Sequence, residues 1–330
     1  MSTILVTGGA GYIGSHVVKE LLHQGYRPIV FDNLQTGHRK AVKNAFFIEG
    51  DLSDARKLKE TFQSYPIQAV MHFAADCLVG ESVQNPLKYF NNNIKNGLQL
   101  LEILEEFKIK KFVFSSSAAV YGEPKETPIS EEHPCAPTNP YGETKWIFEK
   151  VLQAFYDAGK LNFISLRYFN AAGADPEGEL GEDHSQETHL IPLVIKAGLD
   201  ETTVPVYGKD YNTPDGTCIR DYIHVTDLAN AHILALRKLE EGNIFGIYNL
   251  GNGNGCSVQE VIETVKKVTG RKVATLDSPR RPGDPARLVA SSEKIKEELG
   301  WIPRYPDLKT IVETAYKWHR NHPKGYNDKS

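Results

Sequence analysis

The chain has 330 residues, with 38 Lys and Arg against 42 Asp and Glu and a formal net charge of −4. This balance, without a long basic or acidic run, gives no support to binding of nucleic acid or of a membrane surface. No apolar stretch approaches the roughly 20 residues of a membrane span, and the length favours two lobes over one.

The beginning of the chain and its cysteines indicate a cytoplasmic protein. Met1-Ser2-Thr3 leads directly into an apolar run, without the basic segment and cleavage site of a signal peptide. The four cysteines are scattered and form no C-x-x-C pair, so we expect free thiols in a reducing compartment. No cluster of His and Cys has the spacing of zinc ligands, so we expect no metal.

The first predicted unit is a strand, a glycine-rich turn and a helix. Ile4-Leu5-Val6-Thr7 is an apolar, β-branched run typical of a buried strand. Gly8, Gly11 and Gly14 follow with the spacing G-x-x-G-x-x-G, and apolar residues then recur at helical spacing. Glycines also serve plain strand-to-helix packing. A turn between a strand and a helix, however, is the context that favours a phosphate-binding loop.

Polar residues follow the next strand-like runs. Asp32 comes directly after residues 28–31, where a carboxylate can accept hydrogen bonds from an adenine ribose and repel a 2′-phosphate. NAD is therefore favoured over NADP. Asp51 and Phe73-Ala74 stand at later strand ends, which line the ligand crevice of an open parallel sheet. Asp51 could equally be a helix N-cap, and Phe73 a core residue.

Strands and helices alternate by pattern from residue 3 to about 170, with further strand-like runs at 111–114 and 163–166. This alternation is typical of an α/β fold. We therefore expect a doubly wound parallel Rossmann sheet that binds NAD over residues 1–170.

The pattern changes beyond residue 170. Residues 173–187 are rich in Gly, Asp and Glu, and several prolines follow. We expect a smaller mixed α/β lobe over residues 171–330. A strand-like run at 247–250 predicts that the chain returns to the first lobe near 218–250.

Tyr141 and Lys145 are four residues apart, so a helix places them one turn apart on the same face. A free phenol is a poor base at neutral pH, and a neighbouring ammonium lowers its pKa. With Ser117 from a strand end, the trio can take a proton from an alcohol while a cofactor takes the hydride. A tyrosine and lysine at this spacing are often plain surface residues; the glycine-rich turn favours the catalytic interpretation.

Segments along nearly the whole chain resemble the extended short-chain dehydrogenase/reductase family and, within it, nucleotide-sugar 4-epimerases. The resemblance rests on TGGAGYIGSH at 7–16, DNL at 32–34, HFAA at 72–75, FSSSAAVYG at 114–122, NPYGETK at 139–145, LRYFNAAGA at 166–174, GTCIRDYIHV at 216–225, YNLGNG at 248–253 and RRPGDPA at 280–286.

The resemblance implies an isomerase that interconverts UDP-glucose and UDP-galactose through a transient 4-keto sugar, with NAD retained throughout. It implies that Tyr141 takes the proton of the sugar 4-hydroxyl, that Lys145 assists, and that Ser117 hydrogen-bonds the same oxygen. It also implies a second lobe that mainly binds the UDP-sugar.

Two sets of binding residues follow from the same resemblance. The implied NAD contacts are Gly8, Gly11, Tyr12, Ile13, Gly14, Asp32, Asn33, Asp51, Leu52, Phe73, Ala74, Asn92, Tyr141, Lys145 and Phe169. The implied UDP-sugar contacts are Ser117, Tyr141, Asn170, His189, Leu190, Tyr207, Arg220, Arg281, Asp284 and Leu288. Without the resemblance, Arg220 and Arg281 would be taken for partners in surface salt bridges.

Four positions depart from the family pattern. Cys77 stands where many members carry a lysine that reaches the cofactor pyrophosphate, and His189 replaces an asparagine near the substrate phosphates. Ala119 replaces a threonine, and Leu288 falls where some members have a tyrosine that bounds the sugar pocket. Because leucine lacks the reach of that ring, we expect UDP-N-acetylhexosamines to be accepted as well.

Other functions fit less well. Sugar-nucleotide 4,6-dehydratases place Asp-Glu before Val-Tyr-Gly, where this chain has Ala118-Ala119. A UDP-glucuronate 4-epimerase stays open, as does a non-catalytic NAD-sensing Rossmann protein, although such proteins typically lose the Tyr–Lys pair.

The helix that begins near Tyr141 carries more apolar surface than one stripe facing a sheet requires. Family members commonly dimerise through this helix and the one at 94–107, so a homodimer is expected. A well-buried helix in a monomer would show the same pattern.

Overall fold

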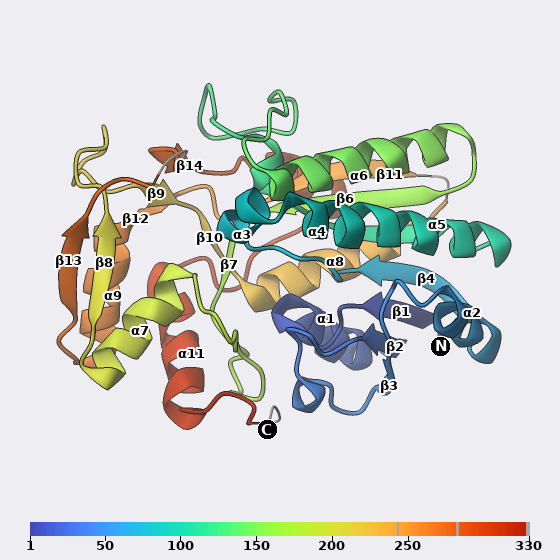
Figure 1. The fold of residues 1–330 in the computed structure, drawn as a ribbon, viewed down its shortest axis with the longest axis horizontal. Helices are drawn as coiled ribbons and strands as arrows, with labels where there is room; N and C mark the ends of the chain where they lie inside the picture. The colour runs from blue at the N-terminus through green and yellow to red at the C-terminus, as the bar shows by residue number, and fades with distance from the viewer. Residues whose placement is uncertain (243, 282–283, 328–330) are drawn as a thin grey trace.

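The computed structural model describes residues 1–242, 244–281 and 284–327. Figure 1 shows a larger layered lobe, which holds the beginning of the chain, beside a smaller lobe built mainly from later segments. The four cysteines, all in the described part, are free thiols. No helix among the described residues combines the length and apolarity that crossing a membrane requires.

A seven-stranded parallel sheet forms the centre of the larger lobe. Its strands in spatial order are β11 (Phe245–Leu250), β6 (Asn162–Tyr168), β5 (Lys111–Ser117), β4 (Ile67–His72), β1 (Thr3–Thr7), β2 (Arg27–Asp32) and β3 (Phe46–Glu49). The strand order reverses next to β1, as in a doubly wound Rossmann sheet. The predicted fold class is confirmed.

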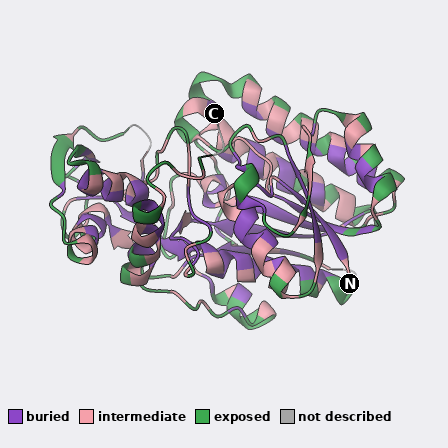
Figure 2. Ribbon diagram, turned by 90° about the horizontal axis from the view of Figure 1, so that it is seen from below, coloured by how far each residue is buried: buried purple, intermediate pink, exposed green. Residues whose placement is uncertain are grey.

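Helices cover both faces of this sheet, which is why its central strands are apolar runs and do not alternate with polar residues. On one face α1 (Tyr12–His23) packs against α8 (Val225–Glu240). On the other face lie α2 (Ala55–Ser64), α5 (Asn96–Glu106) and α6 (Pro140–Asp157). Each face has its own buried apolar core, and the strands between them are buried in Figure 2.

Later parts of the chain rejoin the larger lobe. β11 pairs with β6, so the run at 247–250 is a strand of the central sheet. Helix α10 (Glu293–Leu299) also contacts β11, and Trp301 is completely buried in the core beside it. The sequence analysis did not predict this second return.

The smaller lobe is built on a third apolar core among three helices. These are α7 (Leu190–Asp200), α9 (Val258–Thr269) and α11 (Leu308–Asn321). Small sheets complete it and join the lobes: β8 (Thr203–Tyr207) with β13 (Ala274–Ser278), β7 (Asn170–Ala172) with β10 (Tyr222–His224), and β9 (Ile219–Arg220) between β12 (Cys256–Ser257) and β14 (Arg287–Leu288).

Short helical segments fill the connections near the carboxyl ends of the central strands. These are η1 (Arg39–Ala41), α3 (Val79–Gln84), α4 (Pro86–Tyr89), the π-helix η2 (Phe90–Lys95) and η3 (Ala118–Val120).

Candidate active site

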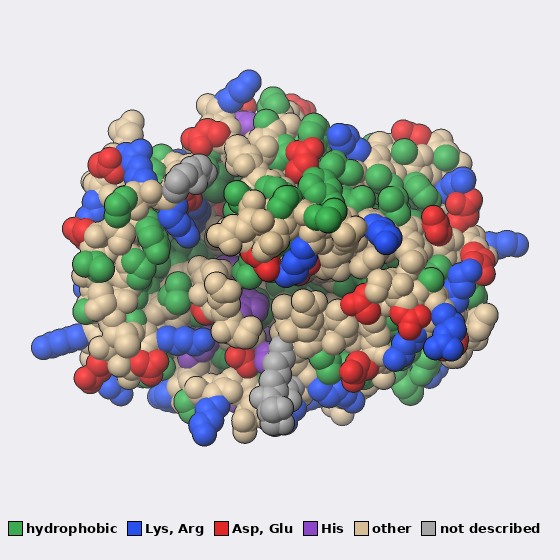
Figure 3. Space-filling view, in the orientation of Figure 1, with side chains coloured by type: hydrophobic (Ala, Val, Ile, Leu, Met, Phe, Trp, Pro, Cys, Tyr) green, Lys and Arg blue, Asp and Glu red, His purple; other side chains and the backbone are tan. Residues whose placement is uncertain are grey.

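A cleft runs along the carboxyl ends of the central strands and is lined by residues of both lobes. Its cavity has a volume of about 460 Å³. Figure 3 shows the surface hollowed near the middle of this face, with histidine side chains visible in the hollow. The cleft lies where the strand order reverses next to β1, the place where open parallel sheets bind their ligands.

The glycine-rich turn lies close to the sheet because its glycines admit backbone contacts. Gly8 has φ +72°, and a Cβ there would lie 2.5 Å from the backbone nitrogen of Ala74. A Cβ at Gly14 would lie 2.2 Å from the carbonyl oxygen of Gly8. The turn and the amino terminus of α1 therefore line the cleft with backbone groups. N–H groups at a helix amino terminus suit a pyrophosphate.

Asp32 lies at the end of β2 and is only 7% exposed. One of its carboxylate oxygens accepts the N–H of Ala10 at 2.9 Å, and the other accepts the N–H of Leu34 at 2.8 Å. The side chain therefore fixes the shape of the glycine-rich turn while it lines the cleft. Its negative charge at this position opposes a 2′-phosphate.

Asp51 lies beyond β3 and forms a polar pair with Asn33, whose amide donates to it at 2.7 Å. Burial raises the pKa of Asp51, but hydrogen bonds from Ser53 and Asn33 outweigh this and hold that pKa below its ordinary value. The alternative of Asp51 as a helix cap is wrong. Asp54 caps α2 by accepting the N–H of Lys57 at 3.0 Å.

Phe73 combines the two roles that the sequence left open. It lines the cleft, and its ring packs against the core with its centroid 4.8 Å from that of His232.

Helix α6 brings Tyr141 to the serine-rich end of β5. Asn139 caps the helix by accepting the N–H of Gly142 at 2.9 Å. A Cβ at Gly142 would lie 2.4 Å from the carbonyl oxygen of Ala119, so the first turn of α6 packs directly on the turn that follows β5. This packing brings the start of α6 to the end of β5, so that Tyr141 and Ser117 line the same cleft.

Lys145 lies one turn further along α6 and is buried. Its ammonium donates to the carbonyl oxygen of Ser115 at 2.7 Å and lies 5.8 Å from the centroid of the Tyr141 ring. It also lies 4.9 Å from the centroid of the Phe114 ring. These contacts hold a positive charge beside the phenol at the floor of the cleft.

Burial dominates the pKa values of the catalytic pair. It raises the pKa of Tyr141 well above its ordinary value. It lowers the pKa of Lys145 to about 8. The expectation that Lys145 lowers the pKa of Tyr141 is therefore not met in this structure, because loss of water around the phenol raises that pKa.

The π-helix η2 packs against α6 and contributes Asn92 to the lining of the cleft. Its Asn92 donates to the Asp76 carboxylate at 3.0 Å, next to the cavity. Its Asn93 accepts the N–H of Asp76 at 2.9 Å and donates to the Thr144 hydroxyl at 3.0 Å. Asn93 thus ties the segment after β4 to the catalytic helix. Such wide helical turns are frequent at functional sites.

Charged residues of the smaller lobe stand at the other end of the cleft. Arg220 forms a hydrogen-bonded ion pair with Asp284, and Arg281 pairs with the same carboxylate at 2.9 Å. The Arg281 guanidinium lies 5.0 Å from the centroid of the Tyr207 ring. Leu288 is opposite Arg220 in the β14–β9 pair, so it lies beside this charged group.

Every residue predicted to contact NAD lines the cleft, as does the catalytic trio. Of the other predicted sugar-nucleotide residues, Asn170, His189, Arg220, Asp284 and Leu288 line it as well. Leu190, Tyr207 and Arg281 are not among the lining residues. Leu190 begins α7 and packs against the core of the smaller lobe, whereas Tyr207 and Arg281 contact each other.

The sequence analysis missed other polar groups of the cleft, among them Asp76, Tyr168 and His184. Tyr168 forms a hydrogen bond with the Ser115 hydroxyl. The position of Asp76 just after a strand was a usable signal, because that is the rule by which Asp32 was found. His184 does not follow a strand, so the same rule could not predict it from the sequence.

Comparison with known proteins gives a consistent result. Residues 4–251 match the model of the family described as "NAD dependent epimerase/dehydratase family". The UDP-glucose 4-epimerase of Halalkalibacterium halodurans is 54% identical over 325 residues, covering 98% of this chain and 97% of that protein.

Solved structures are similar over the same length. The UDP-glucose 4-epimerase of Brucella ovis in complex with NAD has 48% identity and a TM-score of 0.93, covering 96% of this chain and 98% of that one. The UDP-Glc/GlcNAc 4-epimerase of Campylobacter jejuni has 41% identity and a TM-score of 0.85, covering 97% of this chain and 100% of that one.

Proposed function

The chain belongs to the NAD dependent epimerase/dehydratase family, and on that premise we propose that it interconverts UDP-glucose and UDP-galactose by epimerisation at sugar carbon 4. The observation that carries the proposal is that Tyr141 and Ser117 line the same cleft as the glycine-rich turn, with the Lys145 ammonium beside the Tyr141 ring. The enzyme is an isomerase, because the sugar regains the hydride that it gives up.

The chain supplies the proton transfers of this reaction. Tyr141 takes the proton from the sugar 4-hydroxyl and later returns it to the 4-keto sugar, and Ser117 hydrogen-bonds the same oxygen. The Lys145 charge stabilises the phenolate. Bound NAD supplies the hydride acceptor at carbon 4 and a positive ring that favours the phenolate further. Removal of water by the bound ligands strengthens each of these interactions.

The residues present fit NAD. The glycine-rich turn offers N–H groups where a side chain would block approach, and Asp32 opposes the additional phosphate of NADP. We propose that the pyrophosphate lies on this turn and that the adenine ribose lies beside Asp32. The complete NAD-binding set is the one predicted above, all of which lines the cleft.

The UDP-sugar is assigned to the other end of the cleft. Arg220 and Arg281 suit the diphosphate because a planar guanidinium grips two phosphate oxygens. Both pair with Asp284 in this structure, so that carboxylate holds them in position. Asn170, His189 and Leu288 line the same cleft, and we assign them to the sugar-nucleotide as the resemblance implies.

We also propose the division of the chain that follows from this assignment. Residues 1–170 form the NAD-binding lobe, to which the chain returns near 218–250, and residues 171–330 mainly hold the UDP-sugar. The enzyme is cytoplasmic, in keeping with its free thiols. It is a homodimer in which α5 and α6 meet their copies, because Trp146, Ile147 and Phe155 on α6 remain only half-buried in the single chain.

Two rival functions fit less well. A UDP-glucuronate 4-epimerase would share the catalytic trio, but the most similar relatives given above are named for UDP-glucose. A non-catalytic NAD-sensing protein would not need Tyr141 and Ser117 in one cleft with a buried ammonium. Turnover of UDP-glucuronate against UDP-glucose separates the first rival from the proposal.

A direct test uses purified protein with UDP-galactose and no added NAD, followed by proton NMR of the sugar anomeric signals. We expect conversion to a UDP-glucose and UDP-galactose mixture, with NAD released on denaturation. The Tyr141→Phe variant is the matched control, since it keeps the ring and removes the base. Absence of conversion by the wild-type protein with NAD bound would contradict the proposal.

A further inference from the structure

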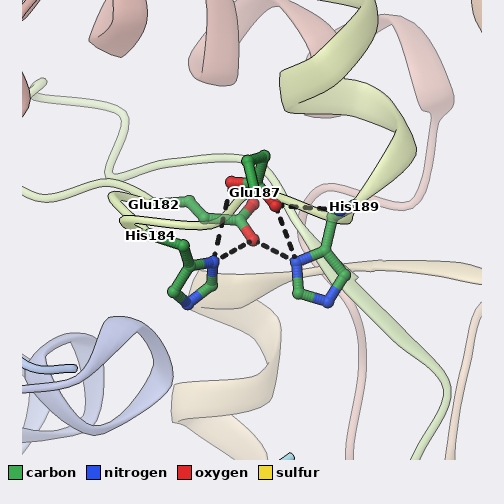
Figure 4. Close-up of side chains that lie close together, drawn as sticks. All are labelled: Glu182, His184, Glu187 and His189. Carbon is green, nitrogen blue, oxygen red and sulfur yellow. Dashed lines mark hydrogen bonds and ion pairs between the residues drawn. The ribbon is translucent and has the colours of Figure 1, made fainter. Parts of the chain in front are cut away.

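Four side chains from one short segment converge beside the cleft, although the sequence analysis did not connect them. Glu182, His184, Glu187 and His189 lie in the connection that leads into α7, and their ligand atoms all lie within 4.8 Å of one another. Figure 4 shows one nitrogen of each imidazole directed at the two carboxylates. Both histidines also line the cavity.

The spacing of these atoms is close to that of a metal site. His184 Nδ1 lies 3.2 Å from a Glu182 oxygen and 3.6 Å from a Glu187 oxygen. His189 Nδ1 lies 3.2 Å from Glu187 and 2.5 Å from Glu182. Ligands bound to zinc at about 2.0–2.1 Å in a tetrahedron lie roughly 3.3 Å apart. Three of the four distances approach that value, and the fourth is a hydrogen bond that an ion would replace.

The charge of the cluster also favours a cation. The Glu182 and Glu187 side chains are only 3% and 5% exposed, and two buried carboxylates this close need positive partners. With neutral imidazoles the group carries two negative charges, which a divalent ion balances.

Glu187 supplies a second and independent observation. Its Oε1 accepts the N–H groups of Thr188 and His189, each at 2.8 Å, so the carboxylate is held in one orientation. Its Oε2 is buried and accepts no hydrogen bond. A fixed carboxylate with one oxygen left for a ligand is the arrangement in which neighbouring hydrogen bonds orient a metal-binding group.

We propose that Glu182, His184, Glu187 and His189 bind a zinc ion, with two imidazole nitrogens and two carboxylate oxygens as ligands. Imidazole ligands favour a first-row ion such as zinc over magnesium or calcium. Four protein ligands leave no open position, so the ion is structural and takes no part in the reaction proposed above. It fixes the segment 182–189 and the amino terminus of α7 against the cleft.

The test measures zinc binding directly, on chain without a polyhistidine tag. Chelator-treated protein that retains NAD is titrated with zinc against a fluorescent chelator, and bound metal is counted by mass spectrometry. We expect one zinc per chain. His184→Gln and Glu187→Gln should each weaken binding by about 100-fold or more, because each removes a ligand. His23→Gln is the control, since that histidine is 75% exposed on α1.

X-ray absorption at the zinc edge then identifies the ligands in the wild-type protein, independently of any variant. The proposal predicts two imidazoles, oxygen neighbours and no sulfur. Circular dichroism and NAD content establish that the variants fold. Less than stoichiometric zinc on the wild-type chain, wild-type affinity in either ligand variant, or a sulfur neighbour would each overturn the proposal. None of these outcomes bears on epimerase activity, which is measured separately.

Discussion

The buried ion pair beneath the active site should be the most sensitive point of the catalytic helix. Glu149 of α6 and Arg167 of β6 are 3% and 5% exposed, and two guanidinium nitrogens bond the carboxylate, Nε at 3.0 Å and Nη2 at 2.5 Å. Arg167 also donates to the Tyr121 hydroxyl at 2.9 Å. Glu149→Leu would leave the guanidinium buried with a neutral partner only.

The expected loss of folding free energy follows from the isolation of the buried Arg167 charge. Removing one partner of a buried pair costs about 3–5 kcal/mol, because the remaining charge keeps its desolvation penalty. Replacing both partners by apolar residues of similar volume is often neutral, so Glu149→Leu with Arg167→Met should recover most of the loss. The exposed pair Lys160–Glu105, 48% and 49% exposed at 2.7 Å, is the control. Glu105→Gln should cost about 1 kcal/mol or less.

Urea unfolding followed by circular dichroism, at fixed pH and saturating NAD, measures these free energies of unfolding. The reasoning fails if Glu149→Leu costs no more than the exposed control. It also fails if the double variant is no more stable than Glu149→Leu alone. Either result would mean that water reaches the Arg167 guanidinium, and that the pair is not buried as the structure shows.

Four further outcomes are expected. Tyr141→Phe should lower kcat by about 10² or more with NAD content unchanged, and near-normal turnover would require another base. Asp32→Ser should reduce the preference for NAD over NADP, measured as the ratio of their dissociation constants. It should also weaken binding of both cofactors, since the Ala10 N–H loses its acceptor. An unchanged ratio would refute the role of the Asp32 charge. In parallel NMR assays, Leu288→Tyr should abolish turnover of UDP-N-acetylhexosamines while sparing turnover of UDP-galactose. Equal loss of turnover on both substrates, or no turnover of N-acetyl sugars by the wild type, would contradict the role of Leu288 in substrate choice. Burial holds the pKa of five histidines at about 3 to 4, below the ordinary 6.5. Because the unfolded chain binds more protons than the folded chain below pH 6.5, folding stability that is present above pH 6.5 should be lost as the pH falls toward 4. A urea midpoint that stays constant over this range would contradict the expectation for these histidines, which are His16, His72, His224, His232 and His319.

Features that depend on local order could be predicted from the residues alone. The strand, turn and helix at the beginning follow from a short apolar run, three glycines and a helical repeat, and β1 and α1 occur where these patterns lie. The helical repeat likewise placed Tyr141 and Lys145 on one face of α6. The position of Asp32 at a strand end fixed its place in the cleft, because parallel strands end at the same edge.

Which distant groups meet, and in what surroundings, depends on packing between the elements. Ser117 and Tyr141 come together because Gly142 admits the backbone of Ala119, a contact between elements far apart in the chain. The raised pKa of Tyr141 depends on burial, which no local pattern measures. The His184 and Glu187 cluster depends on how an irregular segment bends, since it has neither helical nor strand periodicity. Local sequence sets each element, and packing between elements sets the environment of each reactive group.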